Sequence, residues 1–78
     1  MPVIETSQTI DARGLSCPMP IVKTAQAVRT LASGAAVELL ATDPGSTKDV
    51  AAWCRVTGHE ILEQSVEGTV FRFVIRRK

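Results

Sequence analysis

Two closely spaced prolines, Pro18 and Pro20, limit where the first helix of this chain can begin. Proline is tolerated in a first helical turn, because its missing N–H would have no intrahelical partner there. Beyond them, apolar residues recur at the spacing of one helix face: Ile21, Val22, Ala25, Val28 and Ala32. Gly34 follows where a C-cap glycine belongs. The pattern predicts a helix that starts at Pro18 and ends before Gly34.

Alternating apolar residues and turn residues predict the remaining elements. We expect strands over residues 3–10, 37–42, 59–65 and 70–76, and a second helix over residues 47–56 that ends at Gly58. The order β-α-β-α-β-β predicts an α/β (α+β) two-layer sandwich, in which a four-stranded mixed sheet carries both helices on one face. At 78 residues, the chain 1–78 is expected to form one domain.

The predicted core draws apolar side chains from every element. It comprises Ile10, Ile21, Val22, Ala25, Val28, Val37, Leu39, Val50, Trp53, Ile61, Phe71 and Phe73. Ser46, followed three residues later by Asp49, resembles a capping box for the second helix, and Asp43 lies in the turn before it. We therefore expect Asp43 and Asp49 to hold that turn and cap that helix.

Charge and cysteine content narrow the classes of function. Nine basic and eight acidic residues give a net charge of +1, which argues against a nucleic-acid or membrane partner. No signal peptide or long apolar span is visible, so a cytoplasmic protein is expected. Cys17 and Cys54 do not form a CxxC pattern, and in a reducing compartment both are expected to be free thiols.

Cys17 is the residue that suggests chemistry. With Pro18 as the first helical residue, Cys17 would be the N-cap, and its sulfur would face the positive end of the helix dipole. Such a position lowers the pKa of a cysteine thiol, so we expect an activated thiolate. Gly14 would let the incoming loop pass close to the helix end. His59 is the only histidine and is expected at the far end of the second helix, so Cys17 resembles a group carrier more than a hydrolytic nucleophile.

The pattern Asp11-x-x-Gly14-x-x-Cys17-Pro18-x-Pro20 resembles the signature of the TusA (SirA-like) family of sulfur carriers. The resemblance continues through Asp43-Pro44, Asp49 and Gly58-His59-Glu60, over nearly the whole chain. It implies a βαβαββ sandwich in which Cys17 accepts sulfane sulfur as a persulfide, and in which Gly14, Pro18 and Pro20 shape the active loop. The protein would be a sulfur-transfer protein rather than a stand-alone enzyme.

The same resemblance implies partners. The sulfur would come from a cysteine desulfurase or a rhodanese-type donor and pass to the cysteine of a downstream acceptor protein. The route would be tRNA thiolation, molybdenum cofactor assembly or sulfur oxidation, and the sequence does not choose among them, nor between sulfur and selenium. Neither a cofactor nor a metal is implied; a single histidine and no paired cysteines give no metal-binding pattern.

Other residues carry weaker hypotheses. Asp11, Arg13 and Met19 flank Cys17 and are candidates for contacts with the persulfide or a partner. Cys54 is expected to be a buried, inert thiol. Two alternative functions stay open: a thiol redox module that uses Cys17 and Cys54, and a nucleic-acid-binding module. The second would use Arg72 and Arg76 on the open sheet face, against which the low net charge argues.

Overall fold

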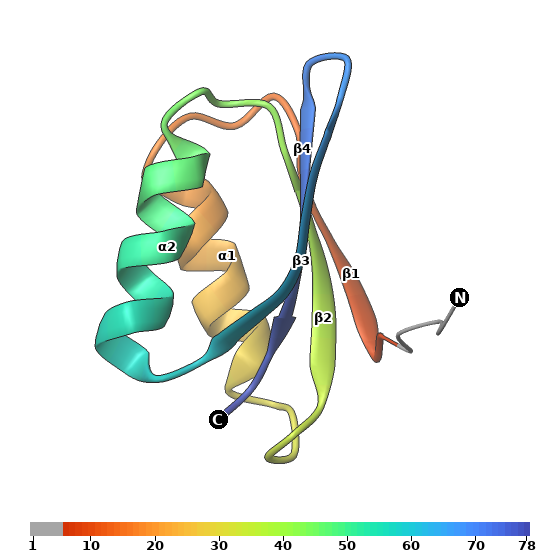
Figure 1. The fold of residues 1–78 in the computed structure, drawn as a ribbon, viewed down its shortest axis with the longest axis vertical. Helices are drawn as coiled ribbons and strands as arrows, with labels where there is room; N and C mark the ends of the chain where they lie inside the picture. Colours follow the sequence, from red (N-terminus) through yellow and green to blue (C-terminus); the bar gives the residue numbers. More distant parts are fainter. Residues whose placement is uncertain (1–5) are drawn as a thin grey trace.

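The structure is a computed structural model that describes residues 6–78. Its elements are β1 (Gln8–Ala12), α1 (Met19–Val28), β2 (Ala36–Ala41), α2 (Ser46–Thr57), β3 (Glu60–Glu67) and β4 (Val70–Arg76). Both helices cover the same face of the sheet, so the molecule has two layers (Figure 1). The predicted order β-α-β-α-β-β and the two-layer α+β sandwich are confirmed.

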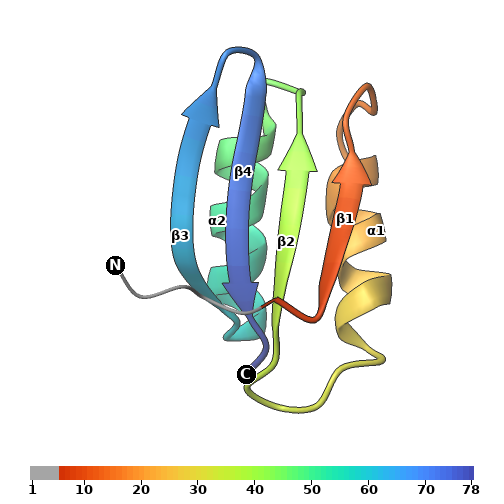
Figure 2. The ribbon, with the colours of Figure 1, turned by 90° about the vertical axis from the view of Figure 1, so that its right-hand side faces the viewer.

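The four strands form one mixed sheet in the order β1-β2-β4-β3 (Figure 2). β1 is parallel to β2, whereas β4 is antiparallel to both of its neighbours. β3 and β4 make the predicted hairpin, whose turn contains Gly68 at a φ of 61°. Because β1 and β2 are parallel, the loops that follow them emerge at the same edge of the sheet, and each leads into a helix. This edge positions the site described below.

The core lies between the sheet and the helices. Its largest fully buried apolar side chains are Phe73, Leu39, Ile75, Val37 and Val50. Trp53, Ile61, Phe71 and Ile21, all predicted core residues, are partly buried and pack against the core cluster. The prediction for Val22 was wrong, because this side chain is 38% exposed. α1 instead buries Pro20, Thr24 and Val28, and the Thr24 hydroxyl is satisfied by donating to the Pro20 carbonyl.

The predicted bounds of the first two elements need correction. α1 begins at Met19 and ends at Val28, with Arg29 as its C-cap, so Gly34 is not the C-cap. Gly34 instead takes a φ of 87° in the connection to β2, where its N–H donates to the Arg77 carbonyl. Pairing with β2 sets the first strand at Gln8–Ala12, later than expected, and residues 3–5 of the predicted strand lie outside the described residues.

α2 matches its prediction at one end and departs from it at the other. Gly58 is the C-cap, with a φ of 85°, as expected. The capping box was wrong: the N-cap is Gly45, and no side chain caps the helix. The Ser46 hydroxyl is buried and has no hydrogen-bond partner, and Asp49 points elsewhere. The Asp49 carboxylate instead accepts a hydrogen bond from Cys17, and this contact defines the site described below.

Candidate functional site

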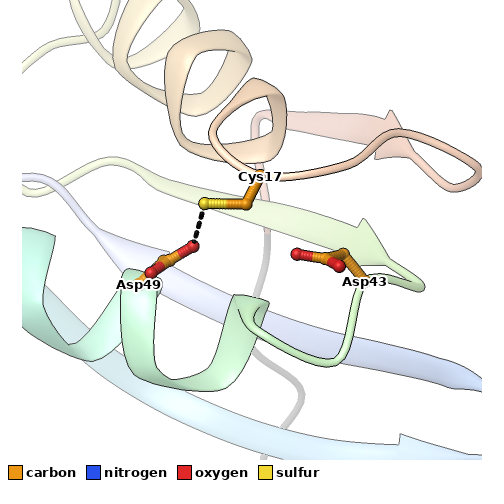
Figure 3. Close-up of side chains that lie close together, drawn as sticks. All are labelled: Cys17, Asp43 and Asp49. Carbon is orange, nitrogen blue, oxygen red and sulfur yellow. Dashed lines mark hydrogen bonds between the residues drawn. The ribbon is translucent and has the colours of Figure 1, made fainter.

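Cys17 lies in the loop that connects the end of β1 to the start of α1, at the carboxyl edge of the parallel strands. The loop after β2, which contains Asp43, and the first turn of α2, which contains Asp49, meet it there (Figure 3). The Cys17 side chain is exposed, whereas Asp43 and Asp49 are half-buried. One thiol and two carboxylates from three segments of the chain therefore share one small region.

The Cys17 thiol donates a hydrogen bond to Asp49 Oδ2, and the sulfur–oxygen distance is 2.7 Å. Asp43 approaches from the other side in the close-up, and the sulfur and one oxygen of each carboxylate lie within 4.8 Å of one another. Gly45 leaves room for Asp43, because a methyl group there would lie 3.2 Å from Asp43 Oδ2, whereas its distance of 3.8 Å from Asp49 Oδ2 would be an ordinary contact.

This arrangement overturns the expected activation of the thiol. The hydrogen bond to Asp49 and the negative charges of Asp49 and Asp43 raise the pKa of Cys17 above its ordinary value, because they favour the protonated sulfur. Pro18, not Cys17, is the N-cap, so the sulfur precedes the helix by one residue more than expected. The N–H of Met19 donates to the Ser16 carbonyl and that of Ile21 to the Pro18 carbonyl, so neither is free for the sulfur. The unloaded site therefore holds a thiol.

Backbone and side-chain contacts hold the loop in place. Gly14 has a φ of 81°, and its N–H donates to Thr42 Oγ1 at 2.8 Å, which ties the loop to the chain after β2. Leu15 closes the turn by donating its N–H to the Ala12 carbonyl. The Cys17–Pro18 peptide bond is cis. Gly14 is thus favoured by its left-handed conformation and not by the close approach to the helix end that the sequence suggested, because a methyl group there would have no neighbour within 4 Å.

Asp11 and Arg13 pair with each other. The Arg13 guanidinium donates two hydrogen bonds of 2.8 Å to the two oxygens of Asp11. This pairing lowers the pKa of Asp11 to about 2 and raises that of Arg13. Met19, the remaining flanking candidate, is 44% exposed at the start of α1 and leaves an apolar side chain beside Cys17 in the sequence.

The structure separates Cys17 from the other groups considered for chemistry. His59 follows the C-cap of α2, at the opposite end of the helix from Asp49, and its ring packs against Trp53 with centroids 5.0 Å apart. Cys54 is a free, buried thiol that is 5% exposed and belongs to the core cluster. It lies five residues beyond Asp49, about 7.5 Å further along the helix axis. Burial raises its pKa to about 11.

The cations of the open sheet face are engaged with acids. Arg72 binds Glu38 at 2.5 Å and Glu63 at 3.2 Å, and Arg76 pairs with Glu60. The pKa of Glu38 is lowered, mainly because its carboxylate accepts a hydrogen bond from Arg72. These pairs leave little free positive charge at Arg72 and Arg76 for a phosphate backbone, which weakens the nucleic-acid alternative.

Cys17, Asp43 and Asp49 are also the residue types that hold cations. Exposed acidic groups are common in proteins without an ion, and here the sulfur is occupied by its bond to Asp49. Within residues 6–78, no helix is long and apolar enough to cross a membrane.

Asp49 is the residue of this site that sequence reasoning misplaced. Its spacing from Ser46 suggested a helix cap, whereas its side chain, on the first turn of α2, accepts a hydrogen bond from Cys17 in the loop before α1. The signal that could have placed it is the parallel arrangement of the first two strands. That arrangement brings the starts of both helices to one edge of the sheet.

Comparisons with known proteins agree with this site and fold. The family model described as sulfurtransferase TusA matches residues 8–77. The sulfur carrier protein TusA of Allochromatium vinosum is 41% identical over 70 residues, which cover 90% of this chain and 92% of that protein. The YrkI protein of Bacillus subtilis is 43% identical over 74 residues, which cover 95% of this chain and 99% of YrkI.

A solved structure has the same fold. The crystal structure of the SirA-like protein from Desulfitobacterium hafniense superimposes with a TM-score of 0.79 at 25% identity, over 88% of this chain and 95% of that one. The sequence match spans nearly all the described residues. The chain therefore belongs to the TusA family of sulfur carrier proteins.

Proposed function

We propose that this sulfur carrier holds sulfane sulfur as a persulfide on Cys17 and relays it to a cysteine of an acceptor protein. The observation that carries the proposal is the exposed Cys17 thiol, presented on a loop at the edge of the sheet. The other cysteine is buried in the core. A carrier thiol must be reached by two other proteins in turn, and Cys17 meets that requirement where Cys54 does not.

The loop residues have structural parts in this proposal. Gly14 anchors the loop through Thr42, while Pro18 and Pro20 stiffen the chain on the other side of the sulfur. Met19 offers an exposed apolar contact for a partner next to the thiol. Asp11 and Arg13 form a charged pair at the start of the same loop, where a partner that docks on Cys17 would meet them.

The expected partners are other proteins. The donor would be a cysteine desulfurase or a rhodanese-type protein, and the acceptor a protein of tRNA thiolation, cofactor assembly or sulfur oxidation. We expect this exchange to take place in the cytoplasm, where a thiol stays reduced between cycles. No cofactor is needed, because the transfer exchanges one S–S bond for another.

Intact-mass analysis tests the proposal. The purified protein is incubated with a cysteine desulfurase and cysteine, then measured with and without reductant. We expect a gain of one sulfur, about 32 Da, that reductant removes. Cys17→Ser should abolish the gain, while the matched variant Cys54→Ala should keep it. If Cys17→Ser still gains a reducible sulfur, the proposal is wrong; if the wild type gains none, a rhodanese and then a polysulfide are tested as donors, and failure with all three refutes it.

A further inference from the structure

The proton on Cys17 has a defined place in this structure. It lies in the 2.7 Å hydrogen bond between the Cys17 sulfur and Asp49 Oδ2. A candidate general base must lie within about 2.6–3.2 Å of the atom whose proton it takes, and Asp49 meets that condition. The carboxylate is held by α2, whose first turn is anchored by the Asp49 N–H donating to the Gly45 carbonyl.

The same contact restrains the thiol. The carboxylates of Asp49 and Asp43 both disfavour a second negative charge on the sulfur, so few molecules carry a thiolate in the absence of a partner. The thiolate is the nucleophile in sulfur exchange, so the Cys17 thiol has to give up its proton when it reacts. Asp49 Oδ2, which already accepts a hydrogen bond from this thiol, is positioned to take the proton.

We propose that Asp49 is the acid–base partner of Cys17: it holds the thiol proton in the unloaded carrier, accepts it as sulfur arrives and returns it to the sulfur that leaves. This inference rests on the proposed function, because it assigns a residue to the persulfide step. Asp43 contributes charge to the site, without the hydrogen bond.

The step balances without an outside oxidant or reductant. The Cys17 sulfur attacks the terminal sulfur of a donor persulfide while its proton moves to Asp49 Oδ2. A new S–S bond forms on Cys17, the S–S bond of the donor breaks, and its electron pair leaves with the donor's inner sulfur. That sulfur takes the proton from Asp49. The sum is Cys17–SH plus donor–S–SH giving Cys17–S–SH plus donor–SH, and unloading to an acceptor is the same exchange in reverse.

Two rates measured on the same variants test this role. The first is alkylation of Cys17 by iodoacetamide, a neutral reagent whose rate follows the thiolate fraction. The second is persulfide formation on Cys17 from glutathione persulfide, a small donor that needs no docking surface. Asp49→Asn keeps the side-chain shape and removes the base. Asp43→Asn is the matched control, because it removes the same charge from the same cluster but leaves the hydrogen bond.

The two rates should move in opposite directions in Asp49→Asn. We expect alkylation at neutral pH to rise by about twofold or more, because the thiolate is no longer disfavoured. Persulfide formation should fall by about tenfold or more, at the lower end of what acid–base groups contribute. Asp43→Asn should also alkylate faster and should load at least as fast as wild type. Asp49→Glu, which restores a carboxylate, should recover part of the loading rate.

Other outcomes overturn the proposal. If persulfide forms on Asp49→Asn as fast as on wild type, or if its rate rises together with the alkylation rate, Asp49 only suppresses the thiolate and does not transfer the proton. If alkylation is unchanged, Asp49 does not hold the thiol proton in solution. If wild-type Cys17 takes no sulfur from glutathione persulfide or from a protein donor, the carrier function itself fails. That last result is told apart from the others because it appears in the wild type. Circular dichroism of each variant checks that the fold is kept.

Discussion

Replacing Cys54 with alanine separates a carrier from a thiol redox module, because only the redox module needs a second thiol. Cys54 packs in the core and is 5% exposed. Its pKa of about 11 leaves roughly 0.03% of it as thiolate at pH 7.5, too little for ready exchange. We therefore expect Cys54→Ala to leave sulfur loading of Cys17 unchanged and to affect stability alone.

The size of the stability effect follows from burial. Cys54→Ala removes one buried sulfur atom, comparable to or somewhat larger than a methylene, and leaves a small cavity, which together cost about 1–2 kcal/mol. A chain of this length has a free energy of unfolding of about 4–12 kcal/mol. Even at the unfavourable extreme, about 2 kcal/mol remains, and roughly 3% of the molecules are unfolded. The loss is therefore too small to abolish loading through unfolding.

Two measurements check this prediction. Chemical denaturation gives the free energy of unfolding of Cys54→Ala relative to wild type, and intact mass gives the fraction of Cys17 loaded after incubation with the desulfurase and cysteine. Cys54→Ser serves as the control for packing, since a buried hydroxyl without a partner should cost more than alanine. A folded Cys54→Ala protein that no longer loads would refute the reasoning and restore the redox module.

Three further predictions concern other parts of the chain. Gly58→Ala should lower the free energy of unfolding by about 1 kcal/mol, because the C-cap φ of 85° disfavours a side chain and the new methyl would meet Lys78 at 2.7 Å; an unchanged denaturation midpoint would contradict this. NMR titration should find the pKa of Asp11 near 2, and Arg13→Gln should move it back towards 3.8. A pKa lowered by folding means that this pair stabilises the protein above pH 3.8 and that the contribution is lost as the pH falls towards 2; a titration unaffected by Arg13→Gln would exclude the pair in solution. Met19→Glu should slow loading from a protein donor while loading from glutathione persulfide changes little, and equal slowing of both would argue against a docking contact.

The strand and helix order was predictable because the apolar periodicity is consistent along the chain. Phe71, Phe73 and Ile75 alternate on β4, and all three face the helices as expected from their spacing. The bounds were less predictable where tertiary contacts decide them. The first helix stops at Val28, although apolar residues continue at helical spacing to Ala32, because the chain must turn there to reach β2. Val22 shows the same limit: spacing alone did not identify which side of α1 meets the sheet.

The protonation state of the Cys17 thiol could not be predicted from the neighbouring sequence. Local sequence suggested a lowered pKa, because a cysteine before a helix faces the dipole and two prolines remove competing N–H groups. The structure reverses the direction of the shift through Asp49, which is 32 residues away in the sequence. Two parallel strands bring the starts of both helices to one edge, so the positive end of α1 and an acid on α2 act on the same sulfur. The carboxylate, a full charge at 2.7 Å from the sulfur, opposes the dipole, whose partial charge at the helix end is about half a unit. A site between two helix starts therefore has to be judged from both helices together, and the measurements on Asp49→Asn, with Asp43→Asn as the charge control, show how far the acid on α2 controls the thiol.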